Sequence, residues 1–408
     1  MNDTQITEKL RAAGQLQILR FYDELDDREK QSLKDQIIQT DFSYLSRFSS
    51  KDNPASRGVI TPLKAMTLSE IACRQAEYEE AGLKALASGR IAAVCLAGGM
   101  GTRLGFDGPK GCFDIGITHP VYIFQRLIEN LMLRVKSCGR WIWLFFMTSE
   151  NNDEATRAFL EEHKYFGYDP SYIRFFRQEM APAVGEDGQV LLETKSRIAV
   201  SPNGNGGWFR SMQSAGFISL LQEQGVDFLN VFAVDNVLQN ICDPVFIGAV
   251  LDSGCASGSK VVRKNSPDER VGAMCLEDGR TSVIEYYEMS EAMRHETGPD
   301  GERLYNFGVT LNYLFRIPDL VKAADDKLPV HFAHKKIECV DEEGNRVMPD
   351  QPNGWKFEYF IFDILHILDG CLPFEIERNK EFAPIKNASG TDSPDSAREL
   401  CRMNGIIL

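Results

Sequence analysis

Long hydrophobic runs are missing from this chain of 408 residues. No apolar run exceeds the seven residues 141–147, whereas a membrane-spanning helix needs roughly 20. Residues 1–5 carry no basic stretch that leads into an apolar one, so no export signal is visible. These absences predict a cytoplasmic protein without a transmembrane segment and without a membrane partner.

Paired cysteine motifs and an excess of positive charge are missing too. The ten cysteines form no C-x-x-C pair, so we expect reduced thiols in place of a disulfide framework. The formal net charge is −14, which argues against a nucleic-acid partner, because nucleic-acid-binding surfaces are basic. A small phosphate site stays compatible with this charge, since it needs only a few local cations and backbone N–H groups.

The spacing of the apolar residues predicts an α/β fold. Residues 1–90 have apolar positions at helical spacing and predict a helical N-terminal lobe. The continuous apolar run at residues 91–97 then predicts a buried parallel strand. Further strand candidates alternate with helical stretches; the strands are expected at residues 141–148, 173–176, 228–234 and 259–262, and the helices at residues 121–135 and 155–163.

This alternation predicts a doubly wound, mostly parallel, Rossmann-like sheet with ligands at the carboxyl ends of its strands. We expect that sheet in a central nucleotidyltransferase domain at residues 91–330. A small C-terminal lobe is expected at residues 331–408, with a helix near residues 356–368.

A glycine-rich loop directly follows the first predicted strand of the sheet. It reads L-A-G-G-M-G-T-R-L-G at residues 96–105 and continues to P-K-G at residues 109–111. Glycines let a backbone approach a phosphate and turn its N–H groups inward, while Arg103 and Lys110 supply fixed positive charge. The loop therefore predicts a triphosphate-binding site.

Three other interpretations of a glycine-rich loop are a Walker A loop, a dinucleotide-binding loop and a plain tight turn. A Walker A loop requires G-x-x-x-x-G-K-[ST], but Lys110 follows a proline and precedes a glycine. A dinucleotide fingerprint requires G-x-G-x-x-G and an acid about 20 residues later, but Gly99, Gly101 and Gly105 are spaced differently and residues 118–126 hold no acid. A tight turn with a surface arginine and lysine is the structural alternative.

The loop resembles the signature of the eukaryotic-type UDP-N-acetylhexosamine pyrophosphorylases, a UDP-sugar pyrophosphorylase family. Further blocks that resemble this family follow in the same order, at residues 175–183, 201–208, 234–238 with 243–244, 271–272, 284–290, 356–358 with 362–363, and 381–388. The resemblance implies a nucleotide-sugar-transferase fold. It also implies a uridylyltransferase that converts UTP and N-acetylglucosamine 1-phosphate, or a related sugar 1-phosphate, to a UDP-sugar and pyrophosphate.

The glycine loop and the family resemblance together predict which residues bind UTP. Arg103, Lys110 and Lys386 are predicted to be catalytic, because they can neutralise the triphosphate and the departing pyrophosphate. The resemblance implies a UTP-binding set that consists of Leu96, Ala97, Gly98, Gly99, Lys110, Gln178, Gly204 and Asp235. An amide such as that of Gln178 offers the donor and the acceptor that suit the polar edge of uracil.

The sugar side and the metal complete the predicted site. The resemblance implies sugar contacts from Asn205, Gly272, Glu285, Tyr286, Asn312, Lys356 and Lys386. Asp235 ends the predicted strand at residues 228–234 and is expected to hold Mg²⁺, which prefers carboxylate oxygen and keeps several waters. The alternative for Asp235 is a carboxylate that merely caps a turn.

Uridylyl transfer requires no general base, and the six histidines form no recognisable base or nucleophile motif. Two alternatives stay open at this point. One is a UDP-glucose or UDP-galactose pyrophosphorylase, and the other is a catalytically inactive sugar-nucleotide sensor. No feature of the sequence indicates an oligomeric state.

Overall fold

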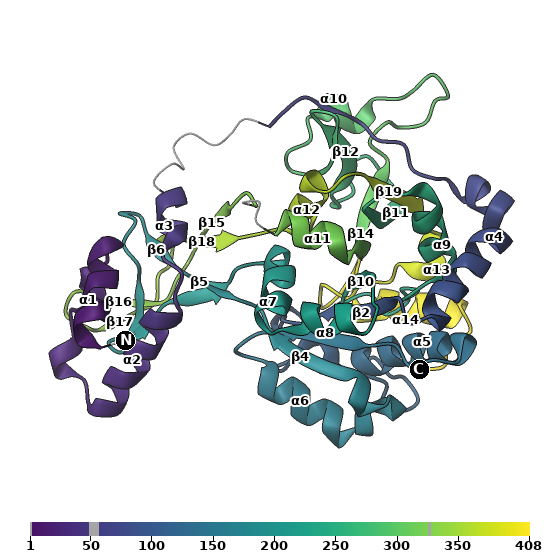
Figure 1. The fold of residues 1–408 in the computed structure, drawn as a ribbon. Coiled ribbons are helices and arrows are strands. Elements are labelled where there is room, and N and C mark those ends of the chain that lie inside the picture. The colour runs from purple at the N-terminus through teal and green to yellow at the C-terminus, as the bar shows by residue number, and fades with distance from the viewer. Residues whose placement is uncertain (1, 49–56, 325–327) are drawn as a thin grey trace. The chain divides into compact units, whose positions relative to one another are not determined.

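The computed structural model describes residues 2–48, 57–324 and 328–408, which form two compact units (Figure 1). Unit 1 is drawn from Met1–Ser56, Gln178–Gly207 and Leu328–Ile361, and unit 2 from Arg57–Arg177, Trp208–Lys327 and Phe362–Leu408. The units do not follow the three consecutive segments 1–90, 91–330 and 331–408, because the chain returns to unit 1 twice.

A ten-stranded mixed sheet forms the centre of unit 2. Its main path runs in the order β1 (Ile60–Pro62), β12 (Ala273–Glu277), β14 (Phe307–Arg316), β10 (Phe228–Ala233), β2 (Ile91–Leu96), β3 (Leu144–Thr148) and β4 (Ile173–Arg177). The remaining strands are β13 (Arg280–Ile284), which pairs with β12, and β11 (Ser257–Arg263) and β19 (Cys371–Glu375), which branch from β14. Strands β10, β2, β3 and β4 are parallel, and β14 is antiparallel to β10. The predicted α/β sheet is confirmed.

Helices of unit 2 bury the strands of this sheet. The longer ones are α4 (Leu68–Ala87), α5 (Ile123–Cys138), α6 (Asp153–Glu162), α9 (Pro244–Ser253) and α14 (Pro394–Met403), and the short ones include α7 (Trp208–Ser214), α8 (Phe217–Glu223), α10 (Glu291–His295), α11 (Ile317–Ala323) and α13 (Arg378–Glu381). Every residue of β2 and β3 is buried, which explains why both strands are continuous apolar runs in the sequence.

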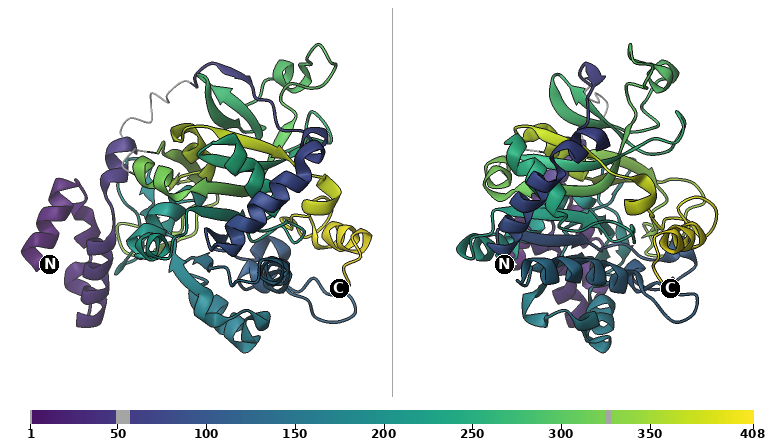
Figure 2. Two further views of the ribbon diagram at one scale, coloured as in Figure 1. Left: turned by 45° about the vertical axis from the view of Figure 1, so that its right-hand side comes forward. Right: turned by 90° about the vertical axis from the view of Figure 1, so that its right-hand side faces the viewer.

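Helices α4 and α9 pack closely against each other. In the left view of Figure 2 the dark-blue helix α4 crosses in front of the sheet. A Cβ atom added to Gly82 would lie 1.9 Å from the carbonyl oxygen of Pro244, and one added to Gly248 would lie 1.9 Å from that of Tyr78. Only glycine at these two positions allows the two backbones to approach so closely.

Two loops leave the same edge of the sheet. Because β2 and β10 are parallel and Leu96 pairs with Ala233, the glycine loop after β2 and the turn after β10 both start at the carboxyl edge. Ligands of open α/β sheets bind at this edge. The fold of unit 2 therefore brings the glycine loop close to Asp235.

Unit 1 combines the N-terminal helices with small sheets. Its helices are α1 (Asp3–Ala12), α2 (Asp27–Gln39) and α3 (Ser43–Phe48), and its three-stranded sheet has the order β15 (His331–Lys335), β18 (Gly354–Glu358) and β6 (Val184–Gly185). Two-stranded sheets pair β5 (Met180–Pro182) with β9 (Val200–Pro202), β7 (Leu192–Thr194) with β8 (Arg197–Ile198), and β16 (Cys339–Val340) with β17 (Arg346–Val347). Leu33, Ile37, Tyr44 and Phe357 belong to one buried core.

The helix expected near residues 356–368 is wrong in its first part. The chain stays in strand β18 to Glu358, and helix α12 spans only Ile361–Ile367. Apolar and polar residues alternate from Trp355 to Tyr359, and this period of two favours a strand over a helix. Within the three described ranges of the chain, every helix is too short or too polar to span a bilayer.

Candidate active site

The glycine loop folds back on itself through backbone hydrogen bonds. The N–H of Gly101 donates to the oxygen of Gly108 at 2.8 Å, and the N–H of Lys110 donates to the oxygen of Gly99 at 3.1 Å. No acceptor in the described part of the chain takes the N–H groups of Gly98 or Gly99. The loop thus holds two backbone donors in place for an anion.

A buried asparagine in the turn between β3 and α6 supports this loop. Asn152 is 1% exposed, and its Nδ2 donates to the oxygens of Ala97 at 2.9 Å and Gly99 at 3.3 Å. Its Oδ1 accepts from the N–H of Ser149 at 2.8 Å. The sequence did not lead us to predict a role for Asn152. Its position shortly after an apolar strand, where α/β proteins place ligands, could have indicated one.

Three cations and one carboxylate converge beside the loop, and we call Arg103, Lys110 and Lys386 the cation cluster. Lys110 is 8% exposed, and burial lowers its pKa. Asp235 raises the pKa of Lys110, while Arg103 and Lys386 lower it further. Within the described residues, none of the three cations forms an ion pair. Their like charges repel one another, so an anion placed between them would be stabilised.

Asp235 and Lys386 lie on segments that pair directly. The N–H of Ile385 donates to the oxygen of Asp235 at 2.9 Å. The N–H of Lys386 donates to the oxygen of Asp392 at 2.7 Å. Burial raises the pKa of the Asp392 carboxyl, and Lys386 opposes that shift. Asp392 is a further charged neighbour of the cluster.

Three predicted sugar contacts of unit 2 gather around the hairpin of β12 and β13. A Cβ added to Gly272 would lie 3.1 Å from Oε1 of Glu285, so these two residues are neighbours. The oxygen of Tyr286 accepts a hydrogen bond from Nη2 of Arg294 at 3.0 Å. The chain thus places Gly272, Glu285 and Tyr286 in one part of unit 2.

Asn312 stands apart from these residues. It is 1% exposed and lies opposite Phe232 in the pairing of β14 with β10. Its Oδ1 accepts from Nδ2 of Asn230 at 2.8 Å, and its Nδ2 donates to Oε1 of Gln239 at 3.4 Å. The side chain of Asn312 is therefore engaged inside the sheet.

The other predicted contacts belong to unit 1. Gly204 has a φ of +83°, and an added Cβ would lie 2.3 Å from the oxygen of Tyr359, so no other residue fits there without strain. Oδ1 of Asn205 accepts from the N–H of Ile361 at 3.0 Å. Gln178 is 8% exposed, and Lys356 on β18 pairs with Ala333 on β15.

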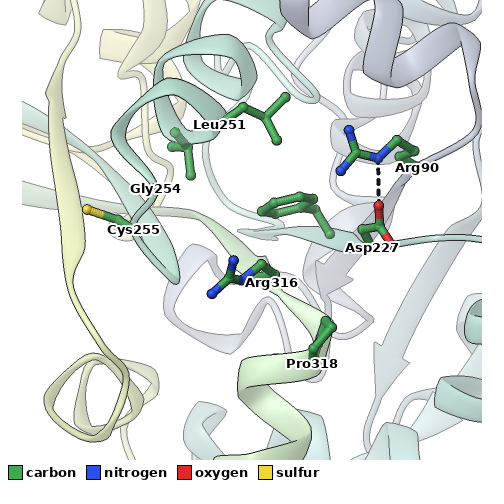
Figure 3. Close-up of a pocket in the computed structure, with 9 residues that line it drawn as sticks. Arg90, Asp227, Leu251, Gly254, Cys255, Arg316 and Pro318 are labelled. Carbon is green, nitrogen blue, oxygen red and sulfur yellow. Dashed lines mark hydrogen bonds and ion pairs between the residues drawn. The ribbon is translucent and has the colours of Figure 1, made fainter.

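A cavity of about 250 Å³ lies at the opposite edge of the sheet (Figure 3). Arg90 and Asp227, which precede β2 and β10, form an ion pair of 2.6 Å at its wall. Arg316 and Cys255 also line it. None of the predicted site residues contributes to this cavity.

Among the described residues, no group of three or more histidines, cysteines, aspartates or glutamates could hold a metal ion. The described part of the chain therefore contains no metal site that is formed by three or more such side chains. The carboxylate of Asp235 beside the glycine loop fits Mg²⁺, which takes one or two carboxylates and completes its shell with phosphate oxygens and water.

The sheet and the cation cluster at its carboxyl edge define an α/β protein of the nucleotide-binding type of architecture. The family model described as UTP-glucose-1-phosphate uridylyltransferase matches residues 42–392, and the chain belongs to this family. The chain is 34% identical over 415 residues to UDP-N-acetylhexosamine pyrophosphorylase-like protein 1 of Xenopus tropicalis, which covers 95% of this chain and 80% of the relative. It is 33% identical to UDP-N-acetylglucosamine pyrophosphorylase of Saccharomyces cerevisiae, over 95% and 87% of the two chains.

Two solved structures that are similar to this chain carry the same family name as the relatives found by sequence. The UDP-N-acetylglucosamine pyrophosphorylase of Trypanosoma brucei, solved with an inhibitor, superposes with a TM-score of 0.84 at 28% identity, over 98% of this chain and 84% of that one. A structure from Entamoeba histolytica, titled as a UDP-N-acetylglucosamine pyrophosphorylase, gives a TM-score of 0.75 at 32% identity, over 83% and 86%. The resemblance found in the sequence is confirmed.

Proposed function

We propose that this protein transfers the uridylyl group of UTP to N-acetylglucosamine 1-phosphate and releases pyrophosphate. The observation that carries the proposal is the cation cluster beside Asp235, at the strand edge where the glycine loop presents two free backbone donors. The names of the similar proteins support the choice of sugar. We further propose a cytoplasmic enzyme, since all ten cysteines are free thiols.

The chemistry is a displacement at phosphorus. A phosphate oxygen of the sugar 1-phosphate attacks the α-phosphorus of UTP in line and forms a new P–O bond. The bond from the α-phosphorus to the oxygen that bridges to the β-phosphate breaks, and pyrophosphate leaves with that oxygen and its electron pair. No proton has to be removed, so positioning and charge stabilisation suffice.

The residues of the proposed site divide this work. Leu96, Ala97, Gly98 and Gly99 would follow the nucleotide with their backbone, and Gln178 and Gly204 would bind the base. Lys110 and Arg103 would bind the β- and γ-phosphates, which become the leaving group. Lys386 would neutralise the entering sugar phosphate. Charge in a half-buried site stabilises a transition state more than charge in water does.

We also propose Mg²⁺ as the cofactor, held by Asp235. When bound, the ion would screen the negative charges of the phosphates that must approach each other. The sugar itself would be bound by Asn205, Gly272, Glu285, Tyr286 and Lys356. Asn312 has the weakest support among the proposed sugar contacts, because its side chain is already hydrogen-bonded in the sheet.

The test is pyrophosphate release by the purified protein with UTP, Mg²⁺ and a panel of sugar 1-phosphates. We expect the highest kcat/KM with N-acetylglucosamine 1-phosphate and none without an acceptor. A higher value with glucose 1-phosphate or galactose 1-phosphate would support the UDP-glucose or UDP-galactose alternative. Binding of UTP without pyrophosphate release under any acceptor would support the sensor alternative and overturn the proposal.

A further inference from the structure

The two charged residues at the heart of the proposed site, Asp235 and Lys386, are far apart in the sequence but lie on paired backbone segments. Asn236 and Pro384 form an antiparallel bridge. The flanking hydrogen bonds run from Ile385 N–H to the oxygen of Asp235 at 2.9 Å and from Val237 N–H to the oxygen of Ala383 at 3.3 Å. Pro384 has no N–H, and it occupies the position at which this pairing uses none.

The side chain of Asn236 strengthens this short pairing. Asn236 is 1% exposed. Its Nδ2 donates to the oxygen of Glu381 at 2.8 Å, and its Oδ1 accepts from the N–H of Ala383 at 2.9 Å. Its Oδ1 also accepts from the N–H of Leu238 at 3.3 Å. The oxygen and the nitrogen of the amide are thus both hydrogen-bonded within the protein, to backbone groups of residues 238, 381 and 383.

Glu381 is also fixed from its other end. Its carboxylate accepts from the ammonium of Lys260 at 2.6 Å, and Lys260 is 1% exposed. The segment 381–386 therefore starts at a residue held by a buried cation through its side chain and by Asn236 through its backbone. Five residues later it carries Lys386 to the cation cluster.

We propose that Asn236 is a positioning residue, which holds the segment 381–386 so that the ammonium of Lys386 stays beside Asp235 and Lys110. The role rests on the proposed function, because it assigns work to Lys386 in uridylyl transfer. Asn236 acts through Lys386 and does not touch the substrate. Its loss should lower kcat and leave the KM for UTP unchanged, because the glycine loop does not depend on it.

A double-mutant cycle tests this role. We expect Asn236→Ala to lower kcat about tenfold to a hundredfold, since a displacement of about 1 Å has such effects. In a Lys386→Ala background the same change should lower kcat by less than about twofold, because the group that it positions is already gone. Equal fold losses in both backgrounds would overturn the proposal and indicate a general loss of structure.

Hydrogen exchange gives a second readout that needs no activity. The amides of Ala383 and Ile385 should exchange faster in Asn236→Ala, while those of β2 keep their rates. Unchanged exchange at both amides would overturn the proposal even where kcat falls. If the wild-type protein releases no pyrophosphate, the proposed function fails, but hydrogen exchange still tests whether Asn236 holds the segment 381–386. Failure of the proposed function and failure of this inference therefore give different results.

Two further variants complete the design. Asn130→Ala is the matched control, because Oδ1 of Asn130 accepts from the N–H of Ile241 at 2.8 Å and, within the described residues, its side chain forms no hydrogen bond with the segment 381–386. It should keep kcat and the exchange rates of the segment. Asn236→Asp keeps the acceptor for Ala383 but loses the donor to Glu381, so it should have an intermediate kcat. It replaces Asn236→Ala in both arms if the alanine variant does not fold.

Discussion

Lys110 combines burial with the lack of a counter-ion. It is 8% exposed, and within the described residues its ammonium has no ion-pair partner, although Asp235 lies near enough to raise its pKa. An unpaired ammonium in such a place costs free energy, and the like charges of Arg103 and Lys386 add to that cost. A bound polyphosphate relieves both costs, which makes the cation cluster the most informative group of residues in the molecule.

Lys110→Met should lower kcat/KM about a hundredfold or more, as the loss of a preorganised phosphate contact does. Methionine keeps most of the side-chain volume, so the fold should survive. Arg103→Ala, an exposed position, should give a comparable loss. Lys136→Ala removes an exposed lysine from the last turn of α5 and serves as the control. Initial rates of pyrophosphate release check this, and near wild-type rates in both loop variants would contradict a phosphate role.

Pyrophosphate affinity should depend on pH through Lys110. Burial lowers the pKa of Lys110 in the free protein, and a bound anion raises it. Affinity is therefore full below the free-protein pKa and decreases as the pH rises through that value. Calorimetric titrations from neutral pH to about pH 10 should show this decrease in the wild type and a flatter profile in Lys110→Met. Protonation of pyrophosphate itself affects both proteins equally. The same dependence of affinity on pH in the wild type and in Lys110→Met would therefore contradict the prediction.

Asp235→Asn should lower kcat steeply while most of the UTP affinity survives. The amide keeps the size of the side chain but lacks the charge that a hard cation prefers. High Mg²⁺ or Mn²⁺ should restore part of the rate. Initial rates against metal concentration for both proteins are the measurement. If both curves share one half-saturation and one plateau, Asp235 caps a turn and holds no metal.

At the scale of elements, a buried ion triad joins β11, the start of α9 and the end of α13. The ammonium of Lys260 lies 2.7 Å from Asp243 and 2.6 Å from Glu381. Nearby carboxylates hold the pKa of Lys260 above its ordinary value in spite of burial. Asp243 also caps α9. The triad therefore links the strand edge to the segment that leads to Lys386.

Lys260→Met should lower the free energy of unfolding on the order of 3–5 kcal/mol, because the buried Asp243 and the partly buried Glu381 lose the cation that they share. Denaturant unfolding of both proteins measures this. Adding Asp243→Asn and Glu381→Gln to Lys260→Met should recover part of the loss, since no charge is then left unpaired. A loss below about 1 kcal/mol for the single variant would assign the triad the small value of an exposed ion pair.

The sequence predicts the bounds of several strands but not the order of the strands in the sheet. Strands β2, β4 and β10 lie within one residue of their expected bounds, because a continuous apolar run between turns has few other solutions. The antiparallel β14 next to β10 was not predicted, since strand order depends on contacts between distant segments. The roles of three further residues could not be predicted for the same reason, since they depend on the backbone groups that these residues meet in the fold. These residues are Asn152, Asn236 and Asp392. Asn312 was expected at the sugar but is hydrogen-bonded inside the sheet.

At the scale of the whole molecule, the predicted contacts fall into two groups. Base recognition is assigned to Gln178 and Gly204 in unit 1, and phosphate recognition to the glycine loop and the cation cluster in unit 2. Unit 1 is drawn from three separate segments of the chain. Mutations can separate the two kinds of recognition, because they involve different side chains.

The ratio of kcat/KM for UTP to that for CTP should be about a hundred or more, because a site that pairs buried polar groups leaves them unsatisfied when the donor and acceptor pattern of the base is inverted. Gln178 is 8% exposed, and Gln178→Ala should lower this ratio while the affinity for pyrophosphate stays unchanged. Lys110→Met should do the opposite, with a large loss of pyrophosphate affinity and an unchanged ratio. Rates with both nucleotides and calorimetry with pyrophosphate, measured for all three proteins, give the comparison. Equal rates with UTP and CTP in the wild type would show that Gln178 does not read the base.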